Sequence, residues 1–88
     1  MIPLTVHNDE MYDLFVDVLD LNTSPPNAIL AGARINQDRS MQISAQEDGN
    51  GQANLQWTAT RADDATIVKS DTVQTGINAT VDVDVFGA

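Results

Sequence analysis

The longest apolar run in the chain extends over residues 12–21 and can be assigned to two kinds of element. On a period of two, Leu14, Val16 and Val18 share one face, and the residues between them share the other. On the helical period the three aspartates of the run share a face instead, and the polar residues before the run could cap a helix. Valine and aromatic residues dominate the run and suit a pleated surface. We therefore predict a strand, with a helix at residues 9–21 as the alternative.

Six further segments carry strand signals, separated by segments rich in Asn, Asp, Gly and Pro. The clearest alternation places Leu55 and Trp57 on one apolar face. Pro3 cannot donate a hydrogen bond to a neighbouring strand, which predicts that the first strand is an edge or that Pro3 stands at its start. Gly32 indicates a bulge or a close backbone approach. The six segments are residues 2–7, 28–35, 41–45, 53–60, 66–75 and 81–85.

This spacing predicts a single all-β domain over residues 1–88. Turn signals every 8 to 12 residues are typical of an antiparallel β-sandwich, here a Greek key of the immunoglobulin-like kind with about seven short strands. Asp-Gly-Asn-Gly at residues 48–51 predicts a hairpin loop. The alternative is an α+β domain with one helix at residues 9–21. The predicted core consists of Leu14, Val16, Val18, Ile43, Leu55, Trp57, Val81, Val83 and Val85.

Composition narrows the classes of partner and compartment. Thirteen acids against four bases give a net charge of −9. This charge argues against nucleic acid and anionic membrane surfaces as partners, since both require a basic face, and it fits a cationic partner. No apolar stretch approaches the roughly 20 residues of a membrane span, so we predict no membrane insertion. The absence of cysteine and of a signal peptide favours the cytoplasm, with non-classical export as the alternative.

The distribution of the acids also predicts the direction of their pKa shifts on folding. Asp13 and Asp17 share one face of the second predicted strand, and Asp82 and Asp84 share one face of the last. Because like charges disfavour ionisation, we expect the pKa values of such carboxyls to be raised on folding.

Three segments carry a resemblance to known proteins. They are the run from Asp13 to Asn22, the Gly32–Asn36 segment and the Trp57–Arg61 segment. Together they resemble small uncharacterised bacterial proteins with an aegerolysin-like or immunoglobulin-like β-sandwich. The resemblance implies the fold and carries over no functional motif. The immunoglobulin pattern is incomplete here, since a tryptophan is present and the cysteine pair is absent.

No motif in the chain indicates an enzyme. His7 is the only histidine, so any Ser-His-Asp triad must include it, and no nucleophile-elbow sequence surrounds a serine. A single histidine without cysteine argues against a zinc site. Glu47–Gly51 lacks the spacing of acids that an EF-hand requires. We therefore predict no catalytic residue, no metal site and no cofactor.

The remaining prediction is a non-enzymatic binding or protein-interaction module, because loops on a β scaffold commonly form recognition surfaces. The candidate loops are residues 22–27, 46–52 and 61–65, and the partner is a protein or a glycan. The candidate contact residues are Asn22, Thr23, Ser24, Asn27, Glu47, Asp48, Asn50, Arg61, Asp63 and Asp64.

Two alternative functions stay open at this point. The first is a structural domain that self-associates through an exposed edge, either the first strand or residues 66–75, so that the chain is a monomer or a weak homo-oligomer. The second is a carbohydrate-binding module, which requires Trp57 or Tyr12 to be exposed.

Overall fold

The computed structural model describes residues 1–88 and contains seven strands and no helix. The prediction of an all-β fold is confirmed. The alternative helix at residues 9–21 is wrong, because alternate residues from Leu14 to Val18 are buried in a strand that occupies most of that run. The strands are β1 (Ile2–Asn8), β2 (Leu14–Asp20), β3 (Asn27–Ile35), β4 (Ser40–Ala45), β5 (Ala53–Arg61), β6 (Val68–Thr75) and β7 (Thr80–Val83).

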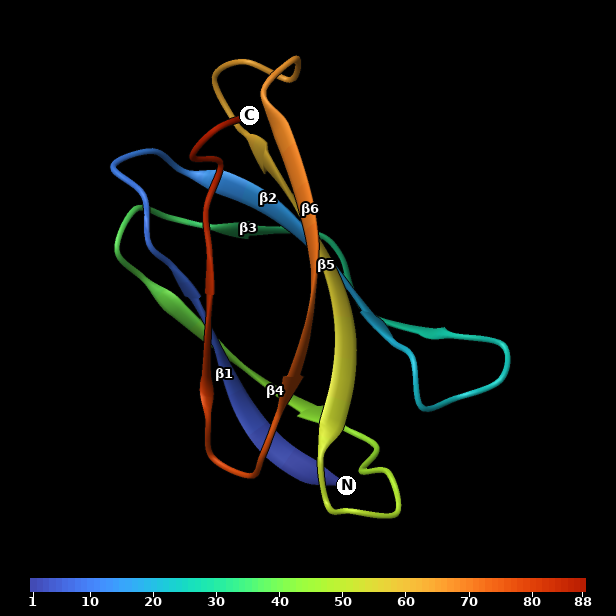
Figure 1. Ribbon diagram of the computed structural model, residues 1–88. Coiled ribbons are helices and arrows are strands. Elements are labelled where there is room, and N and C mark those ends of the chain that lie inside the picture. Colours follow the sequence, from blue (N-terminus) through green and yellow to red (C-terminus); the bar gives the residue numbers. More distant parts are fainter.

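The strands form two sheets, with the orders β4-β1-β7 and β3-β2-β5-β6 (Figure 1). Every pair is antiparallel except β1 with β7, which is parallel, so the prediction of a purely antiparallel fold needs this correction. Since β7 returns from the end at which β1 starts, the two strands run in the same direction. β1 is therefore a central strand, and Pro3 stands at its start, opposite Ser44.

Both sheets contribute to one core of 16 buried hydrophobic residues, which includes all nine predicted core residues. The alternation of apolar and polar residues in β2 and β5 made these core residues predictable, because alternate side chains of a strand face the same side of the sheet. Trp57 is only 5% exposed and lies in this core. Each fully buried valine or leucine of the core contributes about 1.5–3 kcal/mol to folding.

β3 departs from the predicted alternation. Among its apolar residues only Ile35 is buried, whereas Ala31 is exposed and Ala33 is half-buried. The cause is a bulge at Gly32, which has φ +63 and donates its backbone N–H to Oδ1 of Asp17 over 2.6 Å. The expected irregularity at Gly32 is thus confirmed, and it shifts the register between β2 and β3.

The predicted hairpin at residues 48–51 is wrong, because β4 and β5 belong to different sheets. Gly51 has φ +75, so the Asn-Gly sequence does make the tight turn that glycine permits. The same turn chemistry serves a connection that crosses between sheets, and the sequence does not distinguish the two uses.

The two sheets leave two ends with different loops. We call the end formed by residues 9–13, 36–39, 62–67 and 84–88 the hollow end, and the end formed by residues 21–27, 46–52 and 76–79 the polar end. The amino terminus lies near the polar end and the carboxyl terminus at the hollow end (Figure 1). The fold contains no helix that is long and apolar enough to cross a membrane.

Candidate functional site

A buried asparagine holds the base of the hollow end. Asn8 ends β1 and is fully buried. Its Nδ2 donates to the backbone carbonyls of Tyr12, over 2.8 Å, and Ile35, over 2.9 Å. Its Oδ1 accepts the backbone N–H of Glu10 over 2.9 Å. Because every polar atom of this side chain is used, it joins the β1–β2 loop firmly to the end of β3.

A buried glutamate joins the carboxyl-terminal segment to the same loop. Glu10 is buried, and its Oε2 accepts the backbone N–H of Val85 over 2.8 Å. The chain on either side of this bond is exposed: Met11 is 83% exposed and Phe86 is 62% exposed. A buried hydrogen bond thus joins the two backbone segments that bear these two exposed apolar side chains.

Tyr12 stands beside Arg61 at this end. The guanidinium carbon of Arg61 lies 3.7 Å from the centroid of the Tyr12 ring, within the range of a cation–π contact. Arg61 also donates from Nε and Nη2 to the two carboxylate oxygens of Asp63, over 2.8 and 2.7 Å. These hydrogen bonds lower the pKa of Asp63 and raise that of Arg61. The guanidinium is consequently fixed in place.

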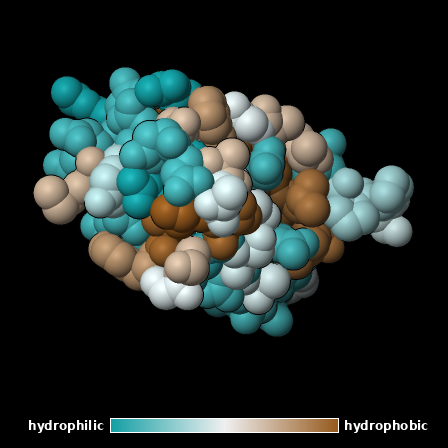
Figure 2. All heavy atoms as spheres, turned by 90° about the horizontal axis from the view of Figure 1, so that it is seen from above, coloured by the Kyte–Doolittle hydropathy of each residue, from teal (hydrophilic) through white to brown (hydrophobic).

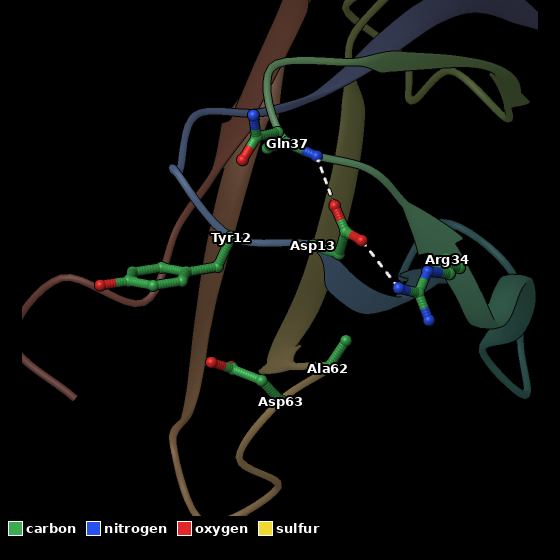
Figure 3. Close-up of a pocket in the computed structure, with 6 residues that line it drawn as sticks. All are labelled: Tyr12, Asp13, Arg34, Gln37, Ala62 and Asp63. Atoms are coloured by element: carbon green, nitrogen blue, oxygen red, sulfur yellow. Dashed lines mark hydrogen bonds and ion pairs between the residues drawn. The ribbon is translucent and has the colours of Figure 1, made fainter.

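Asp13 joins two further elements (Figure 3). Arg34 of β3 donates from Nη2 to Oδ2 of Asp13 over 2.7 Å, and the backbone N–H of Gln37 donates to Oδ1 over 2.9 Å. The bond from Arg34, followed by the bond from Gln37, lowers the pKa of Asp13 below its ordinary value of 3.8. The expectation of a raised pKa is therefore wrong for this carboxyl, because the fold places a base and a backbone donor next to it.

Two adjoining hollows occupy this end and share Tyr12 and Gln37. The smaller hollow measures about 270 Å³ and appears in Figure 3. The larger hollow measures about 510 Å³. From above, apolar groups occupy the middle of the surface between hydrophilic ones (Figure 2). The smaller hollow is lined by Tyr12, Asp13, Arg34, Gln37, Ala62 and Asp63, and the larger by Asp9, Glu10, Met11, Tyr12, Gln37, Asp38 and Phe86.

The hollows differ in charge. Both carboxylates of the smaller hollow are paired with arginines. The larger hollow has three carboxylates in its wall and no basic residue. Among these, the exposed carboxylate of Asp9 makes no hydrogen bond or ion pair within the chain, and that of Asp38 is 89% exposed. The larger hollow therefore combines uncompensated negative charge with exposed apolar groups.

A hydroxyl, an imidazole and a carboxylate also meet near the larger hollow. Nδ1 of His7 lies 2.9 Å from Oγ of Ser40, and Nε2 lies 3.3 Å from Oδ1 of Asp38. In a working triad the carboxylate is buried, so that it orients the imidazole and stabilises its charged form. Asp38 is almost fully solvated, and Ser40 stands within the β1–β4 pairing, directly opposite His7. The three residues are thus arranged as a surface hydrogen-bonded chain, and we assign no chemistry to them.

The predicted contact residues of the polar end are engaged with one another. Nδ2 of Asn22 donates to the backbone carbonyls of Gln46, over 2.8 Å, and Gln52, over 3.1 Å. Nδ2 of Asn54 donates to Oδ1 of Asn22 and to Oδ2 of Asp48. The backbone N–H groups of Gln52 and Asn50, followed by Asn54, lower the pKa of Asp48. These side chains hold the two loops to each other.

The remaining predicted residues are dispersed. The hydroxyl of Thr23 lies within hydrogen-bond distance of the backbone carbonyls of Asp20, at the end of β2, and of Pro25, and Glu47 lies 3.4 Å from the terminal amine. Asp64 accepts from Thr66, which lowers its pKa. Ser24, Asn27 and Asn50 are exposed. The structure therefore places the loops at 22–27 and 46–52 at the polar end and the loop at 61–65 at the hollow end, so the three do not form one surface.

The sequence interpretation missed the exposed apolar residues Met11 and Phe86. One signal was present, because each is a large apolar residue outside the strand alternation: Met11 follows three polar residues, and Phe86 follows the last residue of the alternating segment 81–85. No group of three or more His, Cys, Asp or Glu residues lies close enough together to hold a metal ion. Comparison of the chain with models of protein families, with curated proteins and with solved structures finds no match. The resemblance to aegerolysin-like or immunoglobulin-like proteins therefore stays a prediction.

Proposed function

We propose that this protein is a non-enzymatic binding module that contacts a protein partner through its hollow end. The observation that carries the proposal is the exposure of Met11, Tyr12 and Phe86 around two adjoining hollows. Exposed apolar side chains with a polar rim mark interaction surfaces. The buried contacts of Asn8 and Glu10 hold the backbone that bears these side chains before any partner binds, which lowers the entropic cost of ordering this backbone on association.

The shape of this surface favours a macromolecule over a small ligand. A small-molecule site buries most of the surface of its ligand, about 70–90%. Here Met11 is 83% exposed and Phe86 is 62% exposed, so the larger hollow is bounded by side chains that stand in solvent. A polypeptide that lies across the end can cover both side chains at once.

The two alternative functions have less support. The tryptophan that would form a sugar-stacking surface is buried, and the ring of Tyr12 already contacts Arg61. Self-association through β1 is contradicted, because β1 has a neighbour on each side. β6 is an edge strand, but Lys69 and Asp71 stand opposite Ala59 and Trp57 on the core-facing side of the sheet, where Lys69 is half-buried and Asp71 is exposed. Inward-facing charge is a feature that protects edge strands from pairing.

We also propose that the two sheets form a β-sandwich with a Greek key of the immunoglobulin-like kind. β2, β3 and β4 follow one another in space, and β5 returns to pair with β2 on the other side. This is the order in which the fourth strand lies beside the first, as in a Greek key. The parallel pairing of β1 with β7 is an addition to that pattern.

The test is selection of peptides that bind this protein from a displayed random library, followed by affinity measurement on variants. Met11→Ala and Phe86→Ala remove exposed side chains of the hollow end, and Leu21→Ala removes an exposed apolar side chain of the polar end as the matched control. We expect the hollow-end substitutions to weaken binding at least tenfold and the control to leave it unchanged. Peptides that lose affinity only with Leu21→Ala, or with none of the three variants, would overturn the proposal.

A further inference from the structure

We infer that the larger hollow receives a lysine or arginine side chain of the partner polypeptide. The inference rests on the proposed function and specifies the chemistry of the partner at that site. Its basis is an open apolar hollow whose charge is of one sign: Met11, Tyr12 and Phe86 provide apolar surface, and all the charged residues of its wall are acids.

No lysine or arginine pairs with the acids of the wall. The carboxylate of Asp9 has no partner, Glu10 accepts only the backbone N–H of Val85, and Asp38 meets only the imidazole of His7, at 3.3 Å. Three of the four bases are already paired: Arg34 with Asp13, Arg61 with Asp63 and Lys69 with Asp84, each at 2.7 or 2.8 Å. The fourth base, Arg39, is exposed and follows Asp38 in sequence, but it does not line the hollow. With a net charge of −9, the chain as a whole also attracts a cationic segment.

The three kinds of group in the hollow match the parts of a long basic side chain. The methylene stem of lysine or arginine packs on apolar surface while its charged head remains near water and counter-charge. Met11 and Phe86 offer such surface, and the free carboxylate of Asp9 stands in the same wall. The ring of Phe86 adds attraction for a cation that lies over its face, whereas the ring of Tyr12 is already in contact with Arg61. A purely apolar partner would leave the carboxylates without compensation, and an acidic partner would be repelled.

A second copy of this chain fits the hollow poorly. A two-fold contact places the same surface of both copies face to face. The carboxylates of the two larger hollows would then oppose one another, and like charges across an interface are destabilising. The only base of a second copy that is not already paired is Arg39.

The experiment compares three probes of equal length and different charge: n-butylammonium, n-butanol and n-butyrate. Each is titrated into the whole chain while backbone amide shifts are recorded at low salt. We expect n-butylammonium to shift the amides of residues 9–12 and 86, with an affinity about two- to fivefold above that of n-butanol, the range that a favourable exposed charge pair gives. Raising the salt from about 0.01 M to about 0.15 M is expected to remove most of this preference.

Matched variants locate the charge that matters. Asp9→Asn is expected to reduce the preference for n-butylammonium over n-butanol at least twofold. Glu47→Gln makes the same change in net charge at the polar end and is expected to leave the preference unchanged. Equal loss in both variants would show attraction by net charge alone and would overturn the inference.

The failure of this inference differs from the failure of the proposed function. Peptides that bind at the hollow end without a required basic residue, together with equal affinity for n-butylammonium and n-butanol, would overturn the inference and leave the proposed function standing. Shifts confined to residues 21–27 and 46–52, for every probe and peptide, would overturn both. A required lysine or arginine in the selected peptides, whose replacement by norleucine weakens binding at least fivefold, would support both.

Discussion

The two ends of the molecule use the same kinds of residue in opposite ways. At the polar end, Asn22, Asp48 and Asn54 bond to one another and to backbone groups of the neighbouring loop. At the hollow end, the buried polar side chains of Asn8 and Glu10 hold backbone segments whose other side chains face solvent. In the first case polar side chains join two loops to each other, and in the second they fix backbone segments that bear exposed apolar side chains.

This difference shows that a polar, loop-rich segment is a weak indicator of a binding surface. Loop composition drew attention to residues 22–27 and 46–52, yet many of their polar side chains already have partners within the chain. A group whose hydrogen bonds are satisfied internally gains little by exchanging them for bonds to a ligand. Exposed apolar residues on a rigid support are a better guide, since covering them removes apolar area from water.

The largest effect is expected from the support of the hollow end. Asn8→Ala leaves the buried carbonyl of Ile35, the partly buried carbonyl of Tyr12 and the buried N–H of Glu10 without their partner. We expect this loss to lower the free energy of unfolding by about 3 kcal/mol. Urea denaturation followed by Trp57 fluorescence measures the change. Asn50→Ala serves as the control, because Asn50 is exposed and its side chain makes no hydrogen bond within the chain. A loss below about 1 kcal/mol would show that water reaches the site and that the support is not rigid.

A smaller effect is expected at the polar end. Asn22→Ala removes hydrogen bonds to Gln46, Gln52 and Asn54, but these groups are partly exposed, so water replaces much of what is lost. We expect the free energy of unfolding to fall by about 1 kcal/mol. Amide shift changes should be confined to residues 21–27 and 46–54. Changes of similar size at residues 9–13 would mean that the two ends are coupled through the sheets. They would contradict the view that each end is held by its own polar contacts.

The smallest effect is expected from acid. The pKa values of Asp13, Asp48, Asp63 and Asp64 lie below the ordinary value of 3.8, because each carboxylate accepts hydrogen bonds in the folded chain. In the unfolded chain these carboxyls take up protons first, so the stabilisation they provide is present above about pH 5 and is lost as the pH falls through the lowered values. We therefore expect the midpoint of thermal unfolding to fall steadily from about pH 5 to about pH 2.5.

One variant sharpens this acid prediction. Asp63→Asn removes a carboxylate that is paired with Arg61, so the fall between about pH 5 and about pH 2.5 should become shallower. Asn50→Ala removes no ionisable group and should leave the slope unchanged. A midpoint that rises on acidification would show that repulsion among the acids exceeds these pairings.

Much of the fold could be predicted from the sequence, because burial in a strand follows a period of two. Residues 66–75 were predicted as a strand mainly from their β-propensity, and β3 departs from the alternation. The period of two identified the residues on the buried face of β2 and β5. It also contained an unused signal: Asp20 stands on the buried phase of β2, and the fold buries it as an acceptor for the backbone N–H groups of Asn22 and Gln46. A charged residue on the buried phase indicates a structural polar contact.

The site was harder to predict, because alternation gives the face of a strand and not its neighbour. The larger hollow needs residues 9–12, 37–38 and 86 to meet, and that depends on the parallel pairing of β1 with β7. No local pattern in the chain specifies that pair. The bond from Val85 to Glu10 spans most of the chain and has no counterpart in the spacing of the sequence.

The parallel pairing of β1 with β7 also decides how the molecule can be attached to a surface or to another protein. Since the two strands run in the same direction, the amino terminus and the carboxyl terminus emerge at opposite ends (Figure 1). A tether at Met1 points the hollow end outward and leaves Phe86 accessible. A tether at Ala88 places its attachment two residues from Phe86 and crowds the larger hollow. In a string of such modules, each copy would therefore present its hollow end toward the copy that follows it.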